Sequence, residues 1–272
     1  MSRIEEALNK AIEINQVQQP RAARASAPPP NTEGDAVVVP NDHMLLTLTT
    51  PNSPAAEEYR KLKEAIIKET GREGFNNVLL VTSVNPGEGK TVTTLNLAVS
   101  LAHEFDYTVL LVDADLRAPA CNKYLGIESE KGLSDCLEND TPCTDVLVRT
   151  GIGRLVLFPA GKPVANPVEL ISSSKMRNLI TELKHRYPDR FILIDSPPAK
   201  FFAETRFLAS MADASVMVVR EGESSLDEIA ETAAALDNRV IGIVYNGARE
   251  NPFSKASQYH YYAYSQPEEA GQ

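Results

Sequence analysis

The sequence predicts an α/β fold with a doubly wound, mostly parallel sheet flanked by helices. Three observations predict this fold class. Short apolar runs recur along the chain, segments of helical length separate them, and no internal repeat breaks the alternation. Strands that alternate with helices are typical of parallel sheets covered on both faces. Ligands of such sheets bind at the carboxyl ends of the strands.

The expected elements begin at residue 54. Residues 54–70 have a helical pattern that Gly71 ends, and further helices are expected at 90–104, 174–187 and 225–237. The apolar runs are typical of buried parallel strands, and they lie at 78–83, 108–113, 155–159, 191–195, 215–220 and 240–245.

The two ends differ in composition from this alternating region. Apolar residues recur in the first segment at the spacing of a short amphipathic helix, and the next segment is rich in Pro, Ala and polar residues, which is typical of a disordered linker. We therefore expect an N-terminal helix (1–17), a linker (18–36), a domain (37–250) and a flexible tail (251–272).

Composition narrows the function classes. The 272 residues include 27 Lys and Arg against 37 Asp and Glu, so the net charge is −10. This excess of acids argues against nucleic acid as a partner. The cysteines Cys121, Cys136 and Cys143 form no C-x-x-C pair, which is typical of a reduced compartment. No apolar run approaches the ~18 residues of a spanning helix, and acids lie where a signal peptide would be apolar, so we expect a cytoplasmic protein.

A glycine-rich turn follows the first expected strand. Glycines let backbone N–H groups curl around an anion, and the following helix N-terminus adds positive charge. Lys90 can reach the β- and γ-phosphates of a nucleotide, and the Thr91 hydroxyl can bind Mg²⁺. Val84 replaces the first glycine of the general phosphate-loop pattern, and a turn that only packs a helix on a sheet is the alternative. The nucleotide-binding candidates here are Asn85, Pro86, Gly87, Glu88, Gly89, Lys90, Thr91 and Val92.

Three acids stand at the ends of two other expected strands. Asp113 and Asp115 follow the run at 108–113 and project to one side, and Asp195 ends the run at 191–195. Such acids hold Mg²⁺ or its water shell near the γ-phosphate, whereas a single strand-end Asp is usually a turn residue. We expect Lys90 and the three acids to be catalytic, and Thr91, Asp113 and Asp195 to bind the metal.

The C-terminal segment is dense in tyrosine. Tyr259, Tyr261, Tyr262 and Tyr264 fall within one hexapeptide and lack a clean strand or helix period. An exposed, Tyr-rich tail after a nucleotide-binding core is typical of phosphoacceptors, and a terminal strand or adhesive tail is the alternative.

From about residue 45 to the C-terminus, the chain closely resembles the bacterial tyrosine kinases of polysaccharide export loci. Four motifs carry this resemblance: TSVNPGEGKT, VLLVDADLRAP, FILIDSPP and VIGIVYNG. The resemblance implies a P-loop NTPase fold, ATP and Mg²⁺ as cofactors, and autophosphorylation of the tyrosine cluster on a neighbouring subunit of a ring. It also implies regulation of exopolysaccharide or capsule export. Lys90 and Thr91 match its Walker A pair, Asp113 and Asp115 its second acid motif, Asp195 its Walker B acid, and Asn246 a position near the adenine.

The resemblance also implies partners. These are further copies of the chain, a membrane polysaccharide co-polymerase that regulates chain length, and a protein-tyrosine phosphatase, which would place the protein peripherally at the inner membrane. Glu57, Arg60 and Lys63 match the family's subunit-joining motif, with Lys in place of its last Arg; a solvated helix face is the alternative. Glu204 replaces a frequent Asp, and Arg117 contacts either a phosphate, a partner or an ion-pair acid.

Two other functions compete. A MinD/ParA-like positioning ATPase shares the fold, but its loop carries a lysine where Asn85 stands here. A nucleotide-binding adaptor that tethers an export complex through its N-terminal helix is the third reading. Whether Asp113 or Asp115 accepts the tyrosine proton stays open at this stage.

Overall fold

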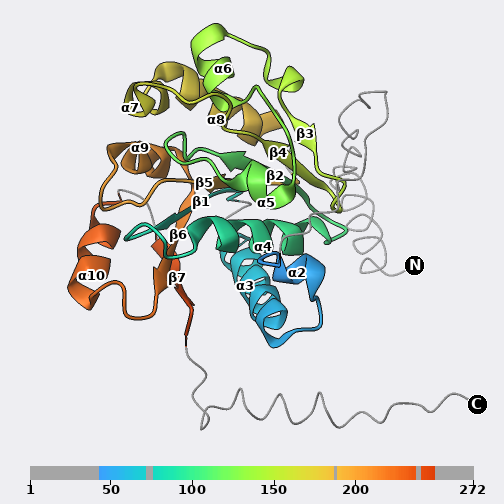
Figure 1. Ribbon diagram of the computed structural model, residues 1–272, viewed down its shortest axis with the longest axis vertical. Helices are drawn as coiled ribbons and strands as arrows, with labels where there is room; N and C mark the ends of the chain where they lie inside the picture. The colour runs from blue at the N-terminus through green and yellow to red at the C-terminus, as the bar shows by residue number, and fades with distance from the viewer. Residues whose placement is uncertain (1–42, 72–75, 187–188, 237–239, 249–272) are drawn as a thin grey trace, which may run out of the picture. The chain divides into compact units, whose positions relative to one another are not determined.

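A computed structural model describes residues 43–71, 76–186, 189–236 and 240–248, all within the unit Asp35–Gln272. Its centre is a seven-stranded sheet in the order β3-β4-β2-β5-β1-β6-β7 (Figure 1). Neighbouring strands are parallel, except that β3 is antiparallel to β4. The strands are β1 (Val78–Ser83), β2 (Thr108–Asp113), β3 (Val148–Arg149), β4 (Leu155–Phe158), β5 (Arg190–Asp195), β6 (Ala214–Arg220) and β7 (Val240–Asn246).

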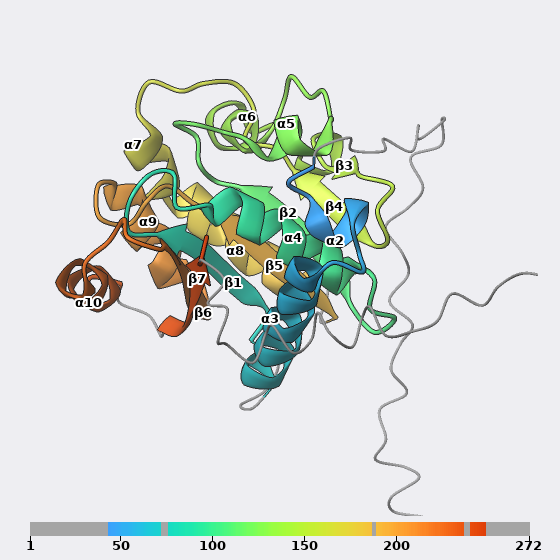
Figure 2. The same ribbon diagram turned by 60° about the horizontal axis from the view of Figure 1, so that its bottom comes forward.

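Helices cover both faces of the sheet (Figures 1 and 2). One face packs against α2 (Leu46–Thr49), α3 (Pro54–Thr70), α4 (Lys90–Ala102) and α5 (Cys121–Leu125). The other packs against α6 (Leu133–Asn139), α7 (Pro167–Ile171), α8 (Ser174–Arg186), α9 (Ala203–Met211) and α10 (Leu226–Ala234). A short 3-10 turn, η1 (Cys143–Asp145), follows α6.

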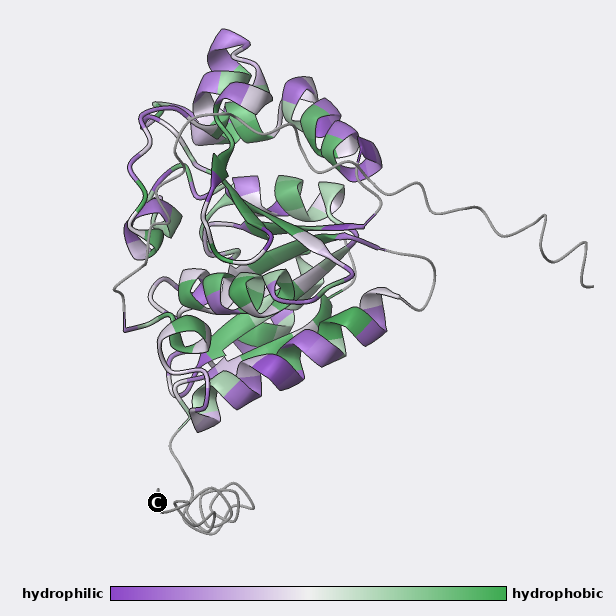
Figure 3. Cartoon of the chain, turned by 90° about the vertical axis from the view of Figure 1, so that its right-hand side faces the viewer, coloured by the Kyte–Doolittle hydropathy of each residue, from purple (hydrophilic) through white to green (hydrophobic). Residues whose placement is uncertain are grey.

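Alternation along the strands divides the core in two. In β1, Leu79 packs with α4, whereas Leu80 packs with the helices of the opposite face. Figure 3 shows the apolar strands between helices whose outward faces are polar. Because both faces are covered, β1 and β5 are buried along their whole length and β2 is buried after its first residue, and the middle of each strand is apolar, as is typical of parallel strands.

Local signals explain where α3 begins and ends. The Ser53 side chain accepts a hydrogen bond from the Ala56 N–H at 3.2 Å, and Pro54 occupies the first helical turn, where it sacrifices no hydrogen bond. The helix ends at Gly71. Helix α4, in contrast, has no side-chain cap. Its N-cap is Gly89 and its first residue is Lys90, so the phosphate loop runs directly into the helix.

The doubly wound fold predicted from the sequence is confirmed. The bounds expected for α3, β1 and β2 agree with the structure, while α4 ends two residues before the expected 104. The sequence pattern missed the short elements α2, α5, α6, α7, α9 and β3. The N-terminal helix, the linker and the tyrosine tail lie outside the described residues. Across the described ranges, no helix is both long enough and apolar enough to span a bilayer.

Candidate active site

The phosphate loop joins β1 to α4 and depends on Gly89. This residue has φ +92°, a left-handed backbone conformation that favours glycine. A Cβ at this position would lie 2.2 Å from the side-chain nitrogen of Asn246 at the end of β7. Any side chain at position 89 would therefore have to displace the Asn246 amide, in addition to adopting the left-handed backbone.

Glu88 braces the loop from inside. Its side chain is fully buried, and its Oε2 accepts a 2.7 Å hydrogen bond from the Asn85 N–H. Its Oε1 accepts a 2.6 Å hydrogen bond from the Ser224 hydroxyl, which lies before α10. Asn246 Nδ2 donates to the Glu88 carbonyl oxygen at 2.8 Å. The Glu88 side chain thus fixes the loop's shape, and the nucleotide contact expected of this residue stays a prediction.

Lys90 and Thr91 meet the strand-end acids. Lys90 Nζ lies 2.8 Å from Asp115 Oδ2 and 3.8 Å from Asp195 Oδ2. The Thr91 hydroxyl donates to Asp195 Oδ2 at 2.7 Å, and the Thr94 hydroxyl donates to Asp195 Oδ1 at 3.1 Å. The first turn of α4 is therefore tied to the end of β5.

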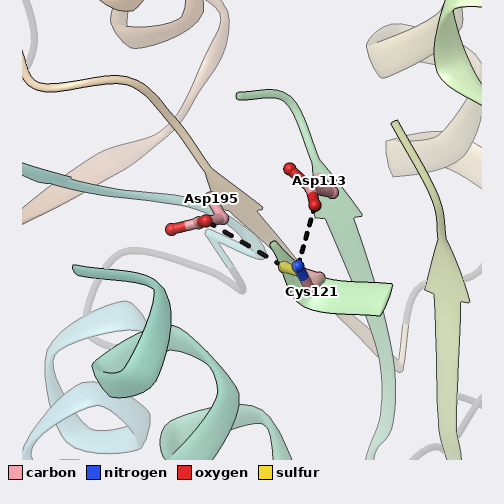
Figure 4. Close-up of side chains that lie close together, drawn as sticks. All are labelled: Asp113, Cys121 and Asp195. Carbon is pink, nitrogen blue, oxygen red and sulfur yellow. Dashed lines mark hydrogen bonds between the residues drawn. The ribbon is translucent and has the colours of Figure 1, made fainter. Parts of the chain in front are cut away.

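Asp113 faces Asp195 because β2 and β5 are parallel neighbours in which these two residues are paired. Asp113 Oδ2 accepts hydrogen bonds from the backbone N–H groups of Ala120 and Cys121, at 3.1 and 3.0 Å. Its Oδ1 is buried and has no hydrogen-bond partner among the described residues. Figure 4 shows Asp113 and Asp195 with Cys121, which approaches from the start of α5.

The electrostatics of the site show an excess of buried negative charge. Burial, together with the Asp195 charge, raises the pKa of Asp113 to about 7. Burial also raises the pKa of Asp195, against the opposing effect of Lys90. For Lys90, burial lowers the pKa, but the charges of Asp195 and Asp115 outweigh it and the pKa is raised. Because three acids share one lysine, and one carboxylate oxygen is unpartnered, the residues fit a bound divalent cation.

Most of the predicted site residues come together here. The carboxyl edge of the sheet brings together the loop 85–92, which includes Lys90 and Thr91, and the acids Asp113, Asp115 and Asp195. Asn246 lies against the loop. Glu57 and Arg60 lie on α3, where they form an exposed i,i+3 ion pair. Lys63 is buried and forms an ion pair with Glu104 of the same chain, so the solvated-face alternative does not hold for this lysine.

Sequence reasoning missed several contacts. Thr94 follows Thr91 by three residues, so helical spacing alone places it on the same face. Ser224 and Cys121 carried no such signal. Of the alternatives for Arg117, the structure shows an ion pair with the buried carboxylate of Glu204. The guanidinium carbon of Arg117 also lies 4.7 Å from the centre of the Phe202 ring.

The chain is similar to known nucleotide-binding proteins and tyrosine kinases. The model of the CobQ/CobB/MinD/ParA nucleotide binding domain matches residues 79–263. Tyrosine-protein kinase YwqD of Bacillus subtilis is 31% identical over 221 residues, which cover 80% of this chain and 90% of YwqD. Putative tyrosine-protein kinase EpsB of Ralstonia nicotianae is 33% identical over 227 residues, which cover 82% of this chain but only 30% of EpsB.

Solved structures show the same relationship. The crystal structure of the chimerical protein CapA2B2 superposes with a TM-score of 0.71 at 26% identity and covers 79% of this chain and 95% of that chain. MinD from Pyrococcus horikoshii, complexed with Mg-ADP, has a TM-score of 0.54 at 25% identity and covers 67% of this chain and 76% of MinD. The resemblance noted in the sequence is thereby confirmed.

Proposed function

This chain belongs to the bacterial tyrosine-protein kinase family and carries the CobQ/CobB/MinD/ParA nucleotide-binding domain, and we propose that it phosphorylates tyrosines of its own C-terminal segment. The acceptors are Tyr259, Tyr261, Tyr262 and Tyr264, and the phosphoryl donor is ATP with Mg²⁺. The observation that carries the proposal is the meeting of Lys90, Thr91 and three buried acids beside a phosphate loop.

The roles of the residues follow from their positions. ATP with Mg²⁺ supplies the transferable γ-phosphoryl group and the divalent charge. Backbone N–H groups of the loop and the Lys90 ammonium bind phosphate oxygens and offset their charge. Asp113 and Asp195, paired across β2 and β5, would hold the cation together with the Thr91 hydroxyl.

Asp115 is the proposed acceptor of the tyrosine proton. Asp113 and Asp195 face each other and are committed to the cation, whereas Asp115 contacts Lys90 from the side. When Lys90 turns to the phosphates, the Asp115 carboxylate is released, and it can take the proton from the attacking tyrosine hydroxyl.

The direct test is mass-spectrometric mapping of phosphotyrosines after incubation with Mg·ATP. The wild type should gain phosphate on the tyrosine cluster, and Lys90→Met should gain none while remaining folded by circular dichroism. Lys175→Met is the matched control, because Lys175 makes a largely exposed ion pair with Asp140 away from the loop. Phosphotyrosine at the wild-type level in Lys90→Met would refute the proposal.

A positioning ATPase of the MinD kind is the rival function, since MinD shares the fold. Its signature lysine is replaced by Asn85, whose side-chain amide donates to Ser224 Oγ at 2.8 Å and whose N–H donates to Glu88. Asn85 is therefore held within its own chain. ATP hydrolysis without any phosphotyrosine would favour this rival, and nucleotide binding without either reaction would favour an adaptor.

We also propose that the kinase acts with partners in polysaccharide export. EpsB is more than three times as long as the region that this chain matches, whereas the match covers 90% of YwqD. The expected partners are a membrane polysaccharide co-polymerase, a phosphatase and further copies of the chain, with peripheral attachment to the inner membrane. Deleting residues 1–18 should leave ATP binding intact and weaken recruitment to the envelope. Unchanged localisation would move recruitment to the kinase domain.

A further inference from the structure

The catalytic scheme leaves one buried side chain at the site unused. Cys121 is the first residue of α5, is fully buried, and places its Sγ 4.0 Å from Asp195 Oδ2. The Cys121 sulfur, one carboxylate oxygen of Asp113 and one of Asp195 all lie within 4.8 Å of one another. The three side chains converge from β2, α5 and β5 (Figure 4).

A second feature of this cluster is that the Asp113 carboxylate is incompletely satisfied. Asp113 is buried, and its Oδ1 has no hydrogen-bond partner among the described residues, while its Oδ2 is fixed by two backbone N–H groups. A buried carboxylate oxygen without a donor is costly, and a bound cation removes that cost. Lys90 does not compensate the charge of this Asp113 oxygen, because the Lys90 ammonium contacts Asp115 and Asp195.

We infer that Asp113, Cys121 and Asp195 form a binding site for a thiophilic divalent cation, with Zn²⁺ as the expected ligand. Zinc accepts cysteine sulfur together with carboxylate oxygen, whereas Mg²⁺ takes oxygen ligands. A tetrahedral zinc ion requires neighbouring sulfur and oxygen ligands about 3.5 Å apart. The side chains therefore need to close by about half an ångström at the Cys121–Asp195 contact, while the thiol releases its proton to solvent.

The position of this site gives it a consequence for the enzyme. Asp113 and Asp195 are the carboxylates assigned above to the magnesium ion of the nucleotide, so zinc and Mg·nucleotide exclude each other. Lys90 lies nearer to Asp115 than to Asp195, 2.8 Å against 3.8 Å, so a cation at Asp195 competes with a longer ion pair and with the hydrogen bonds from Thr91 and Thr94. Zinc is then an inhibitor that holds the nucleotide-free state.

Cobalt(II) alone is the probe, because Co²⁺ follows zinc in its ligands and gives a near-ultraviolet absorption band only when a thiolate binds it. The full chain is used without nucleotide, in a Cys136→Ser/Cys143→Ser background. The chain has three cysteines, so removing Cys136 and Cys143 leaves Cys121 as the remaining thiol, and any thiolate band then reports Cys121.

In that background, Co²⁺ should produce the thiolate band, and both Zn²⁺ and Mg·ADP should abolish it. Cys121→Ser and Cys121→Ala should each lose the band and weaken cobalt binding by about tenfold or more, since even residues behind metal ligands cost that much. Two different replacements are used so that a folding defect in one of them does not decide the result. Thermal unfolding shows whether each variant is folded. A band that survives both replacements, an absent band in the folded background, or a band unaffected by Mg·ADP would overturn the inference. The readout is optical, so it is independent of kinase activity.

Discussion

The side-chain amide of Asn246 donates a 2.8 Å hydrogen bond to the carbonyl oxygen of Glu88, which fastens the end of β7 to the phosphate loop. The same amide fills the space beside Gly89 that any other residue would need for its Cβ. The loop's shape therefore depends on an edge strand more than 150 residues later in the chain.

Gly89→Ala should impair nucleotide binding more than Gly87→Ala. Both glycines have positive φ, so either alanine costs about 1–2 kcal/mol of backbone strain. A Cβ at Gly87 meets nothing within 4 Å, whereas one at Gly89 meets Asn246. Calorimetry of ADP binding measures the difference, and Asn246→Ala should partly restore affinity in the Gly89→Ala protein. Equal losses in both variants would show that the contact with Asn246 is unimportant.

The stability of the nucleotide-free and metal-free protein should fall as pH rises from 4 to 7. The pKa of Asp113 is raised from 3.8 to about 7, so its contribution to stability is complete below pH 4 and is lost as the folded carboxyl ionises. The loss is about 4 kcal/mol at most, and Asp195, with a pKa also raised by burial, acts in the same direction. Urea unfolding at pH 5 and pH 8 measures it. Asp113→Asn should flatten the profile, and parallel profiles would contradict the assignment.

Arg117→Met should destabilise the protein by about 1–3 kcal/mol, because it leaves the buried carboxylate of Glu204 without its cation, although the Arg117 side of the pair faces solvent. The pair Arg117→Met/Glu204→Gln should recover part of that loss, since the neutral amide needs no counter-charge. Urea denaturation of the two single variants and the double variant completes the cycle. Additive losses would mean that the ion pair contributes no coupling.

Substitutions along α3 should separate stability from assembly. Lys63 is buried beside Glu104, so Lys63→Ala should lower the free energy of unfolding by about 1–3 kcal/mol. Glu57→Ala/Arg60→Ala removes an exposed pair worth about 0–1 kcal/mol, so it should leave folding intact. If these two residues join subunits, light scattering will show a smaller assembly and phosphorylation will slow. An unchanged mass, from a wild type that oligomerises, assigns the pair to the solvated face.

The sequence could predict those parts of the site that depend on neighbouring residues or on strand ends. Lys90 and Thr91 follow a glycine turn, and Asp113 and Asp195 end apolar runs, so a parallel sheet brings them to one edge. Thr94 was within reach of the same reasoning, one helical turn after Thr91. All of these inferences rest on short-range pattern and topology.

Contacts between distant segments could not be predicted in this way. The role of Glu88 depends on Ser224, and the burial of Lys63 depends on Glu104, and neither pairing has a local pattern. An acid in a phosphate loop and a lysine on a helix both read as solvent-facing from composition alone. Their partners are set by how α4, α10 and the loops pack, which follows from the whole core.

The bond between Asn246 and Glu88 also determines where the chain leaves the core toward the proposed acceptor tyrosines. Because β7 ends against the phosphate loop, the chain leaves the core beside its own nucleotide site. Tyr259 follows Asn246 by 13 residues, a tether that spans at most about 45 Å when fully extended. The composition of this segment predicts a flexible linker, and a flexible linker of this length would hold the tyrosines at millimolar effective concentration near the anchor. The active site of a neighbouring subunit would therefore compete for these tyrosines with the site of their own chain. Phosphorylation between subunits then requires an assembly that brings another site comparably close and that persists on dilution.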